Sequence, residues 1–364
     1  MRSRPVIVKI GTSSLTDEAG AIDGAAVARL CADVAEVGRD RPVVIVTSGA
    51  IAAGLPALGL DERPRDSVTL QAASAVGQID LLGVYQRALA DHGRVSGQLL
   101  LAPLDFVVRS QYLHARNTLQ RLLELDVVPV INENDAIADD EIRFGDNDRL
   151  AALVAHLIDA EVLVLLTDTE GVLTADPRVD TSASLIEEIV AFDHQLDDLA
   201  GGAGTARGSG GMASKLTAAK IAAWSGVRTV IASASRPGVL AAAVAGDTGV
   251  GTAVVPRPER LGARKLWIAF AVGSKGTVVV DAGARRALED AGRSLLAAGV
   301  LRVEGDFDVG DAVEVADPDG VVFAKGLVRH RHGDLQDLAG KRTGELPDGA
   351  PSVVLHRDDL VMLP

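Results

Sequence analysis

The stretch VVIVTSGAIAAG, residues 43–54, joins a strand-like run to a turn made of very small side chains. Its first four residues are apolar and β-branched, which is typical of a strand buried on both faces. Thr47, Ser48, Gly49 and Ala50 follow, and such small side chains allow close approach to the main chain. The turn therefore suits either tight packing against a helix or binding of a ligand.

Similar apolar runs recur along the chain and alternate with segments of helix length. The other strand-like runs are VIVKI (6–10), VVPVINEND (127–135), VLVLLTD (162–168) and TVIAS (229–233). The helix-length segments cover residues 24–37, 67–93, 110–126, 146–160 and 211–226. This alternation predicts an α/β fold with a mainly parallel central sheet sandwiched by helices.

The pattern changes near Arg260, within PRPERLGARK (256–265), where prolines and charges are concentrated. Beyond this point the chain forms short β-like runs punctuated by Gly, Asp and Pro. We therefore expect an α/β domain over residues 1–258 and a small β-rich domain over residues 259–364.

The composition argues against several classes of protein. The 364 residues carry a net charge of −14, which disfavours a protein whose main partner is nucleic acid. No run of about 18 apolar residues or secretory leader is apparent, so we expect a cytoplasmic protein without a membrane span. The single cysteine, Cys31, excludes an internal disulfide and is expected to be a core thiol.

The carboxyl ends of the predicted strands carry polar, small and acidic residues. Ligands of open α/β sheets bind beyond these ends. Lys9 lies within the apolar run VKIGTSSL (8–15) and is followed by Gly11. A buried lysine needs a partner. Its place at a strand end favours an ammonium group aimed at phosphate oxygens over a lysine that reaches solvent at the sheet edge.

The segment GGAGTARGSGGMASKLTAAK, residues 201–220, is the part of the chain richest in glycine and leads into a predicted helix that contains Lys215. Backbone N–H groups at a helix N-terminus suit phosphate. The segment matches neither the P-loop pattern nor the dinucleotide fingerprint. A surface loop without a ligand is the alternative.

Acids and amides are concentrated in INENDA (131–136) and in DND (146–148). Asp146 or Asn147 suits the N-cap of the following helix, which needs one residue only. The others suit a bound ammonium group or the positioning of cationic side chains. His330 and His332 are expected in an exposed β-turn rather than a metal site, and His156 is expected to be a packing residue.

Six motifs, taken in order, resemble the glutamate 5-kinase family among the amino acid kinases. They are VKIGTSSL, IVTSGAIAAG, VVPVINENDAI, FGDNDRLAA, LLTDTEGVLTADPR and GSGGMASKLTAAKIA. The resemblance implies an amino acid kinase domain followed by a PUA domain. It also implies ATP-dependent phosphorylation of the γ-carboxylate of L-glutamate with Mg²⁺, the first step of proline biosynthesis. Feedback inhibition by proline and a homo-oligomer, dimer or tetramer, are further implications.

The resemblance also implies roles for individual residues. Ser48, Asp135 and Asn147 would bind glutamate. Nucleotide would be bound by Lys9, Thr167, Asp168, Ser209, Gly210, Gly211, Met212, Ala213, Ser214 and Lys215.

Phosphorylating a carboxylate makes few chemical demands. A glutamate side chain is already ionised at neutral pH, so the acceptor needs no general base. The remaining task is to position the reactants and offset phosphoryl charge. We expect Lys9 and Lys215 to flank that group, Asp148 to hold the two lysines, and Gly11 and Gly49 to donate amides. No protein ligand for Mg²⁺ is assigned.

Two alternatives remain open at this stage. Fold does not determine substrate, so the acceptor could be aspartate, acetylglutamate or carbamate. A PUA domain also allows an RNA-binding protein, although the acidic composition argues against it.

Overall fold

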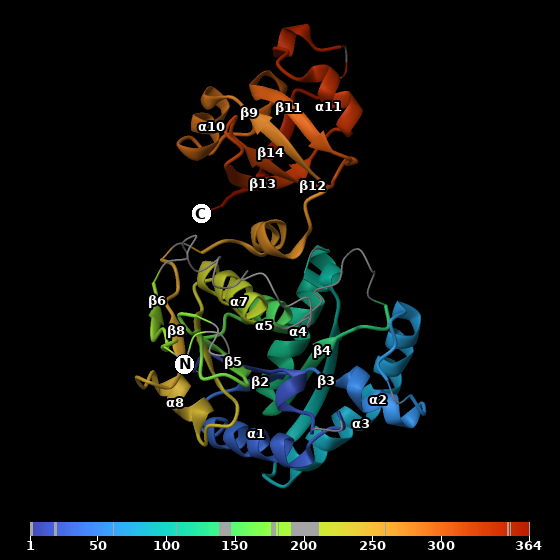
Figure 1. Ribbon diagram of the computed structural model, residues 1–364, viewed down its shortest axis with the longest axis vertical. Helices are drawn as coiled ribbons and strands as arrows, with labels where there is room; N and C mark the ends of the chain where they lie inside the picture. The colour runs from blue at the N-terminus through green and yellow to red at the C-terminus, as the bar shows by residue number, and fades with distance from the viewer. Residues whose placement is uncertain are drawn as a thin grey trace. The chain divides into compact units, whose positions relative to one another are not determined.

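The computed structural model describes residues 3–17, 20–60, 62–106, 108–137, 147–175, 180, 182–190, 211–258, 260–347, 349 and 351–363. The chain divides into two compact units, Met1–Arg260 and Leu261–Pro364, coloured blue to yellow and orange to red in Figure 1. Among the helices described, none combines the length and apolarity that a membrane span requires.

The first unit is built on an eight-stranded sheet with the order β3-β4-β2-β1-β5-β7-β8-β6. The pairing is parallel except between β7 and β8, so the predicted mainly parallel α/β fold is confirmed. The strands are β1 (Val6–Ile10), β2 (Val43–Val46), β3 (Val95–Leu101), β4 (Val127–Glu133), β5 (Val162–Thr167), β6 (Glu188–Ile189), β7 (Arg228–Ser233) and β8 (Thr252–Val254).

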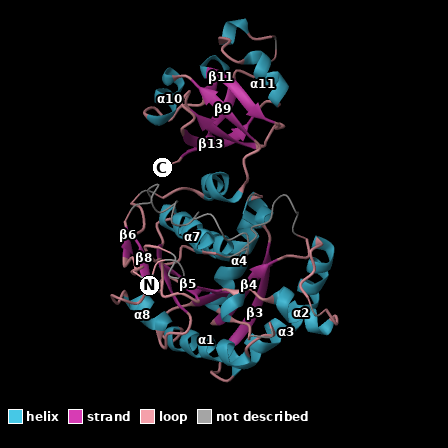
Figure 2. Cartoon of the chain, viewed as in Figure 1, coloured by secondary structure: helices cyan, strands magenta, loops and turns pink. Residues whose placement is uncertain are grey.

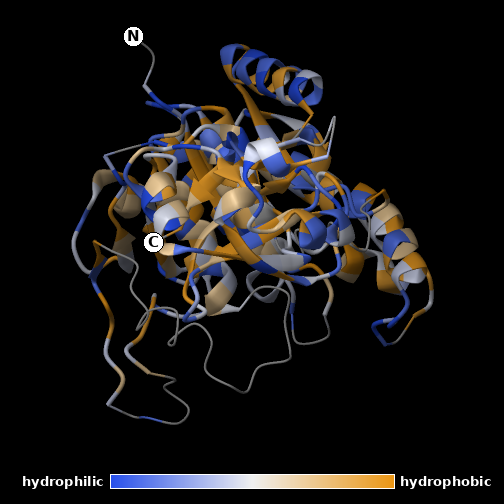
Figure 3. Cartoon of the chain, turned by 90° about the horizontal axis from the view of Figure 1, so that it is seen from above, coloured by the Kyte–Doolittle hydropathy of each residue, from blue (hydrophilic) through white to orange (hydrophobic). Residues whose placement is uncertain are grey.

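Helices cover both faces of this sheet, as the cyan ribbons around the magenta strands of Figure 2 show. One face carries α1 (Gly24–Val37), α3 (Ser67–Ala90) and α8 (Val239–Ala245), with α2 (Ala50–Ala57) packed on α3. The other carries α4 (Arg109–Glu124), α5 (Asn147–Leu157) and α7 (Met212–Trp224). Orange ribbon in Figure 3 is concentrated on the strands, while the helices carry both colours.

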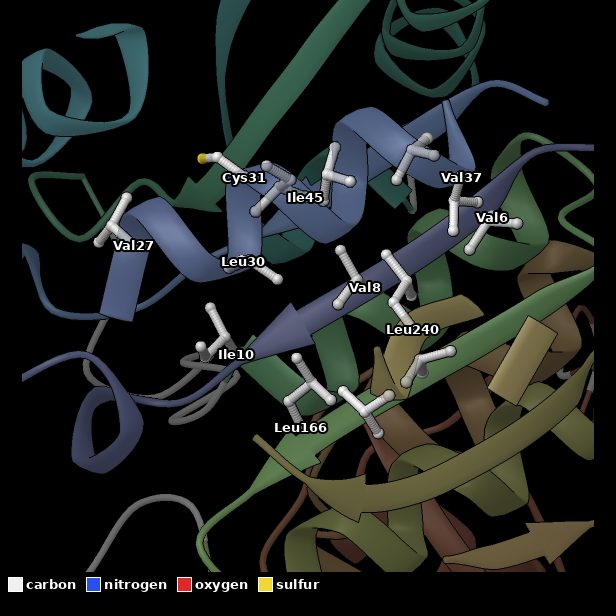
Figure 4. Close-up of a cluster of buried hydrophobic side chains, with 14 of the residues drawn as sticks. Val6, Val8, Ile10, Val27, Leu30, Cys31, Val37, Ile45, Leu166 and Leu240 are labelled. Carbon is white, nitrogen blue, oxygen red and sulfur yellow. The ribbon is translucent and has the colours of Figure 1, made fainter. Parts of the chain in front are cut away.

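The alternation of side chains along β1 fixes the direction of Lys9. Val6, Val8 and Ile10 belong to the core cluster beneath α1, where Figure 4 shows them facing Leu30 and its neighbours. Successive side chains of a strand point to opposite faces. Lys9 therefore points to the other face, toward α5.

Local sequence explains where α1 begins. The Asp23 carboxylate accepts hydrogen bonds from the N–H groups of Ala25 and Ala26, as an N-cap should. The sequence did not predict the edge strand β3 or the short strands β6 and β8. β3 contains Ser96, Gly97 and Gln98, which do not read as a buried strand.

The second unit contains a six-stranded sheet with the order β10-β14-β13-β12-β9-β11, which confirms a small β-rich domain. Its strands are β9 (Gly276–Val280), β10 (Leu295–Leu296), β11 (Val300–Gly305), β12 (Ala312–Ala316), β13 (Val322–Val328) and β14 (Val353–Met362). Its helices are α9 (Ala263–Leu266), α10 (Ala282–Glu289) and α11 (His332–Leu338). Single turns of 3-10 or π helix lie at Thr12–Ser14, Pro103–Phe106, Trp267–Ala271, Ala297–Gly299 and Thr343–Glu345.

The prediction of an exposed β-turn in this unit was wrong for His332, which is half-buried, and also for His330. Its side chain is buried, and Nε2 lies 3.2 Å from the carbonyl oxygen of Val353. This carbonyl belongs to β14, which pairs with β13 just before the histidine. His332 begins α11 and its ring meets that of Phe307 edge to face.

Candidate active site

The four strands β4, β2, β1 and β5 are neighbours and parallel, so their carboxyl ends meet at one edge of the sheet. Lys9 on β1 is paired with Val46 on β2 and with Leu165 on β5. Polar residues predicted from separate motifs are thereby brought to one place.

Two buried lysines share one buried carboxylate at this edge. Lys9 Nζ lies 2.6 Å from Asp148 Oδ1, and Lys215 Nζ lies 3.2 Å from Asp148 Oδ2. The Asp148 side chain is fully buried, and the two lysines are at most 5% exposed. Asp148 lies in the first turn of α5 and Lys215 in that of α7, and these helices pack together. The three side chains carry a net charge of +1, which suits an anionic ligand.

The first turn of α7 adds a hydroxyl to this group. Ser214 Oγ donates to the same Asp148 oxygen as Lys215, over 3.1 Å. Gly211 is the N-cap residue, and Met212 and Ala213 precede Ser214 in the helix. The first N–H groups of a helix have no acceptor within it, so they can bind phosphate oxygens. Ser209 and Gly210 lie outside the described residues.

Gly11 and Gly49 occupy different backbone conformations. Gly49, the N-cap of α2, has φ +102°, which residues with side chains rarely adopt. Gly11 has φ −85°, which any residue adopts, and an added Cβ would lie 3.6 Å from Lys9 Nζ. The fold requires glycine at Gly49, whereas at Gly11 glycine leaves the main chain open beside an ammonium group.

A second group of side chains joins the ends of β2 and β4. Asn147 Nδ2 donates to Ser48 Oγ and to Asn132 Oδ1, each over 3.0 Å. Asn132 Nδ2 in turn donates to Gln78 Oε1 on α3, over 2.9 Å. Asp135 accepts a 2.6 Å hydrogen bond from Ser74, also on α3.

The polarity of this second group matches an amino acid. Ser48 accepts a hydrogen bond from Asn147, so its own hydrogen remains available for an anionic group. Asp135 receives the Ser74 hydroxyl on Oδ2, which leaves Oδ1 to accept from a cation. Both side chains are half-buried. A hydroxyl donor and a carboxylate acceptor complement a carboxylate and an ammonium group.

Thr167 and Asp168 form a separate pair at the end of β5. Thr167 Oγ1 donates to Asp168 Oδ1 over 3.0 Å. The backbone N–H of Ala234, which follows β7, donates to the Thr167 carbonyl.

The described residues were also compared with the ligand sets that metal ions require. Within them no group of three histidine, cysteine or acidic side chains could hold a metal ion. Both oxygens of Asp148 are already engaged by ammonium groups. Mg²⁺ usually keeps several waters and binds through one or two carboxylates together with substrate phosphates.

Burial shifts the pKa of three groups that surround the site without entering it. It raises the pKa of the Cys31 thiol to about 12. It also raises the pKa of the Tyr85 hydroxyl, which is hydrogen-bonded to the Thr47 hydroxyl. Burial lowers the pKa of His156 below its ordinary value of 6.5. A protonated Cys31 and a neutral His156 at pH 7 agree with packing roles.

Ser74 and Gln78 were missed by sequence reasoning, and Asn132 was noted there without a role. The available signal was two polar residues at positions i and i+4 within a helix, flanking Gly77. The contacts themselves join residues 54 and 61 positions apart, which a single sequence does not reveal.

Comparison with known proteins agrees with the motifs. The amino acid kinase family model matches residues 4–233, and the PUA domain model matches residues 276–348. The glutamate 5-kinase of Methylibium petroleiphilum is 44% identical over 99% of this chain and 98% of its own length. That of Geobacter sp. is 44% identical over 98% of this chain and 97% of its own length.

Solved structures bear on the fold alone. An isopentenyl phosphate kinase matches with a TM-score of 0.50 and 20% identity, over 69% of this chain and 100% of that chain. At this identity the substrate is not transferable. Motifs, family models and nearly full-length similarity together show that the chain belongs to the amino acid kinase family, among the glutamate 5-kinases with a carboxyl-terminal PUA domain.

Proposed function

We propose that this chain transfers the γ-phosphoryl group of Mg²⁺-bound ATP to the γ-carboxylate of L-glutamate. The products are L-glutamyl 5-phosphate and ADP, and the reaction is the first step of proline biosynthesis. One observation carries the proposal: a buried Lys9–Asp148–Lys215 group and a hydroxyl–carboxylate pair that matches an amino acid lie at the same sheet edge.

The chemistry follows from the charge of the acceptor. A carboxylate oxygen of glutamate forms a bond to the γ-phosphorus, and the bond from that phosphorus to the β–γ bridging oxygen breaks. The carboxylate is ionised at neutral pH, so no proton has to be removed. The catalytic task is to hold the reactants in line and to stabilise the charge on the phosphoryl oxygens.

Lys9 and Lys215 are the proposed catalytic residues. Their ammonium groups would flank the transferred phosphoryl group, which carries negative charge throughout the transfer. Asp148 holds both lysines from the side of the protein interior. The amides of Gly11 and Gly49 would donate to phosphoryl oxygens, as an open main chain at Gly11 permits.

The amino acid would be held at its other end. Asp135 would accept from the substrate ammonium group, and the Ser48 hydroxyl would donate to the substrate α-carboxylate. Asn147 orients Ser48 through its side-chain amide. This assignment uses the donor and acceptor that the two side chains leave available.

The nucleotide would extend from the lysines across the ends of β5 and α7. We assign to it Thr167, Asp168, Gly211, Met212, Ala213 and Ser214, together with Ser209 and Gly210. When bound as part of the nucleotide, the cation would supply additional positive charge to the phosphates. Residues 1–258 would form the catalytic domain, and residues 259–364 the PUA domain.

Further parts of the proposal rest on family membership. We expect proline to raise the apparent KM for glutamate, which a titration of proline in the rate assay would test. We expect a dimer or tetramer, which sedimentation would measure. The reaction would take place in the cytoplasm, where ATP is supplied.

A panel of acceptors tests the proposed function. ADP release would be measured with glutamate, aspartate, acetylglutamate and carbamate, and acyl phosphates would be trapped with hydroxylamine. Glutamate alone should support rapid, Mg²⁺-dependent ADP release and yield a hydroxamate. Activity confined to acetylglutamate, aspartate or carbamate would overturn the assignment.

A further inference from the structure

Two polar side chains are buried in the middle of α3, on the face toward the site. Ser74 is 4% exposed and Gln78 is 8% exposed. They are one helical turn apart and so share a face. A buried polar group lowers stability unless it is paired. Each of them pairs with the chain at the end of β4, Ser74 with Asp135 and Gln78 with Asn132.

The orientation of the amides between α3 and Ser48 is fixed by a backbone group. The N–H of Glu133 donates to Asn132 Oδ1 over 2.9 Å and to Asn147 Oδ1 over 3.1 Å. A backbone N–H only donates, so both side-chain oxygens must face it. The NH₂ of Asn132 is thereby directed to Gln78, where it needs an acceptor.

Gln78 supplies that acceptor, and a chain of hydrogen bonds continues from it to Ser48. Gln78 Oε1 accepts from the Asn132 amide, and the oxygen of that amide accepts one hydrogen of Asn147. The second Asn147 hydrogen goes to Ser48 Oγ. Without the acceptor on Gln78, a buried NH₂ is left unpaired and Asn132 is driven to rotate. The donor that directs the Ser48 hydroxyl would then be displaced.

The main chain around Ser48 is held by the same part of α3. A Cβ on Gly54 of α2 would lie 1.9 Å from the carbonyl oxygen of Ala73, and one on Gly77 would lie 2.0 Å from that of Ala50. The backbones of α2 and α3 are therefore in direct contact beside Ser74 and Gln78. α2 begins directly after Gly49, so Ser48 is tied to α3 by main chain and side chain alike.

We propose that Gln78 and Ser74 are positioning residues for the amino acid substrate. Gln78 directs the Ser48 hydroxyl toward the substrate carboxylate through two asparagines. Ser74 directs the Asp135 carboxylate toward the substrate ammonium group. One face of α3 thus sets both the polarity and the spacing of the amino acid site. This inference rests on the proposed function and assigns it two residues that do not touch the substrate.

Steady-state kinetics on the full-length chain test the role of Gln78. Gln78→Met keeps the length of the side chain and removes the acceptor. It should raise the KM for glutamate about 10-fold, the effect of one unpaired buried group. The KM for ATP and kcat should change by less than about 3-fold, since neither depends on Ser48 in this scheme. Gln86→Met is the matched control, because Gln86 is exposed on the same helix, and should leave all three parameters unchanged.

Double-mutant cycles separate positioning from a general loss of packing. In a Ser48→Ala background, Gln78→Met should add almost nothing to the KM for glutamate, because its effect passes through the missing hydroxyl. Ser74→Ala should raise that KM about 5-fold alone and add almost nothing in an Asp135→Asn background. When Gln78→Met and Ser74→Ala are combined, their separate effects on the KM for glutamate should multiply, because they act on different ends of the amino acid.

The outcomes are distinct. The proposal would be overturned if the effects of Gln78→Met and Ser48→Ala on the KM for glutamate multiplied. It would also be overturned if Gln78→Met raised the KM for ATP as much as the KM for glutamate and lowered kcat to a similar extent. A folded Gln78→Met enzyme, verified by its thermal transition, with unchanged KM for glutamate would overturn it too. The wild-type enzyme tests the proposed function separately. If it phosphorylates a different amino acid, the same cycles are measured on that acceptor.

Discussion

The two ends of the candidate site use different kinds of side chain. At the phosphoryl end, Lys9, Asp148 and Lys215 carry full charges and are almost wholly buried. Among the described side chains whose hydrogen bonds build the amino acid end, Asp135 is charged, and Ser48, Ser74, Gln78, Asn132 and Asn147 are neutral amides and hydroxyls. Both ends nevertheless lie beyond the same parallel strands.

The difference matches what each end must do during the reaction. The α-carboxylate and the ammonium group of the amino acid keep their charges before and after transfer. Contacts with these two groups therefore stabilise the bound substrate and the transition state equally. The charge on the phosphoryl group is redistributed during transfer, so the lysines contribute most at the transition state. Substitutions at the phosphoryl end should therefore lower kcat, and those at the amino acid end should raise the KM for glutamate.

The largest effect is expected at Lys215. Lys215→Met keeps most of the buried stem and removes the ammonium group, so kcat should fall roughly 10³-fold. The KM for glutamate should stay within about 3-fold, because the amino acid end is untouched. Lys220→Met, on the same helix, is the matched control and should leave kcat unchanged. A large rise in the KM for glutamate with normal kcat would remove the distinction between the two ends.

The next largest effect is expected at Asp148. Asp148→Asn removes the negative charge that the ammonium groups of Lys9 and Lys215 share. We expect the lysines to move apart, kcat to fall about 100-fold, and the free energy of unfolding to fall by about 3 kcal/mol. Kinetics and urea unfolding measure the two effects. An enzyme with normal kcat would show that Asp148 does not position the lysines.

Asp135 tests the opposite end. Asp135→Asn removes the charge that would receive the substrate ammonium group, so the KM for glutamate should rise about 50-fold. kcat at saturating glutamate should stay within about 3-fold. The KM for ATP provides the internal control, since nucleotide is bound elsewhere. A fall in kcat as large as that of Lys215→Met would mean that both ends act on the transition state.

Much of the fold was accessible from the sequence, for physical reasons. Strand β1 and helix α1 occupy the residues predicted for them, because β1 is apolar except for Lys9 and Asp23 caps α1. β3 was missed because an edge strand can hold Gln98 and Gly97, which a strand buried on both faces would not favour. Hydrophobic periodicity reports burial rather than pairing.

The sequence supplied candidate residues for the site, but few of the contacts that join them. Lys9, Asp148 and Lys215 were named from motifs, and the structure brings them within hydrogen-bonding distance. Gln78 was not named, because a glutamine in a helix has no distinctive pattern and its contact depends on how α3 packs against β4. His330 was misjudged for a similar reason, since its burial depends on a strand 23 positions later.

The smallest effect is expected at Cys31, which belongs to the core beneath α1 and touches neither end of the site. Cys31→Ala should leave kcat and both KM values unchanged, and a change at either end would weaken the comparison. Burial raises the pKa of this thiol from an ordinary 9.0 to about 12. Above pH 9 the unfolded chain therefore loses a proton that the folded chain keeps, and stability falls as the pH rises. Urea unfolding between pH 8 and pH 10 should show a shallower fall for Cys31→Ala than for the wild type.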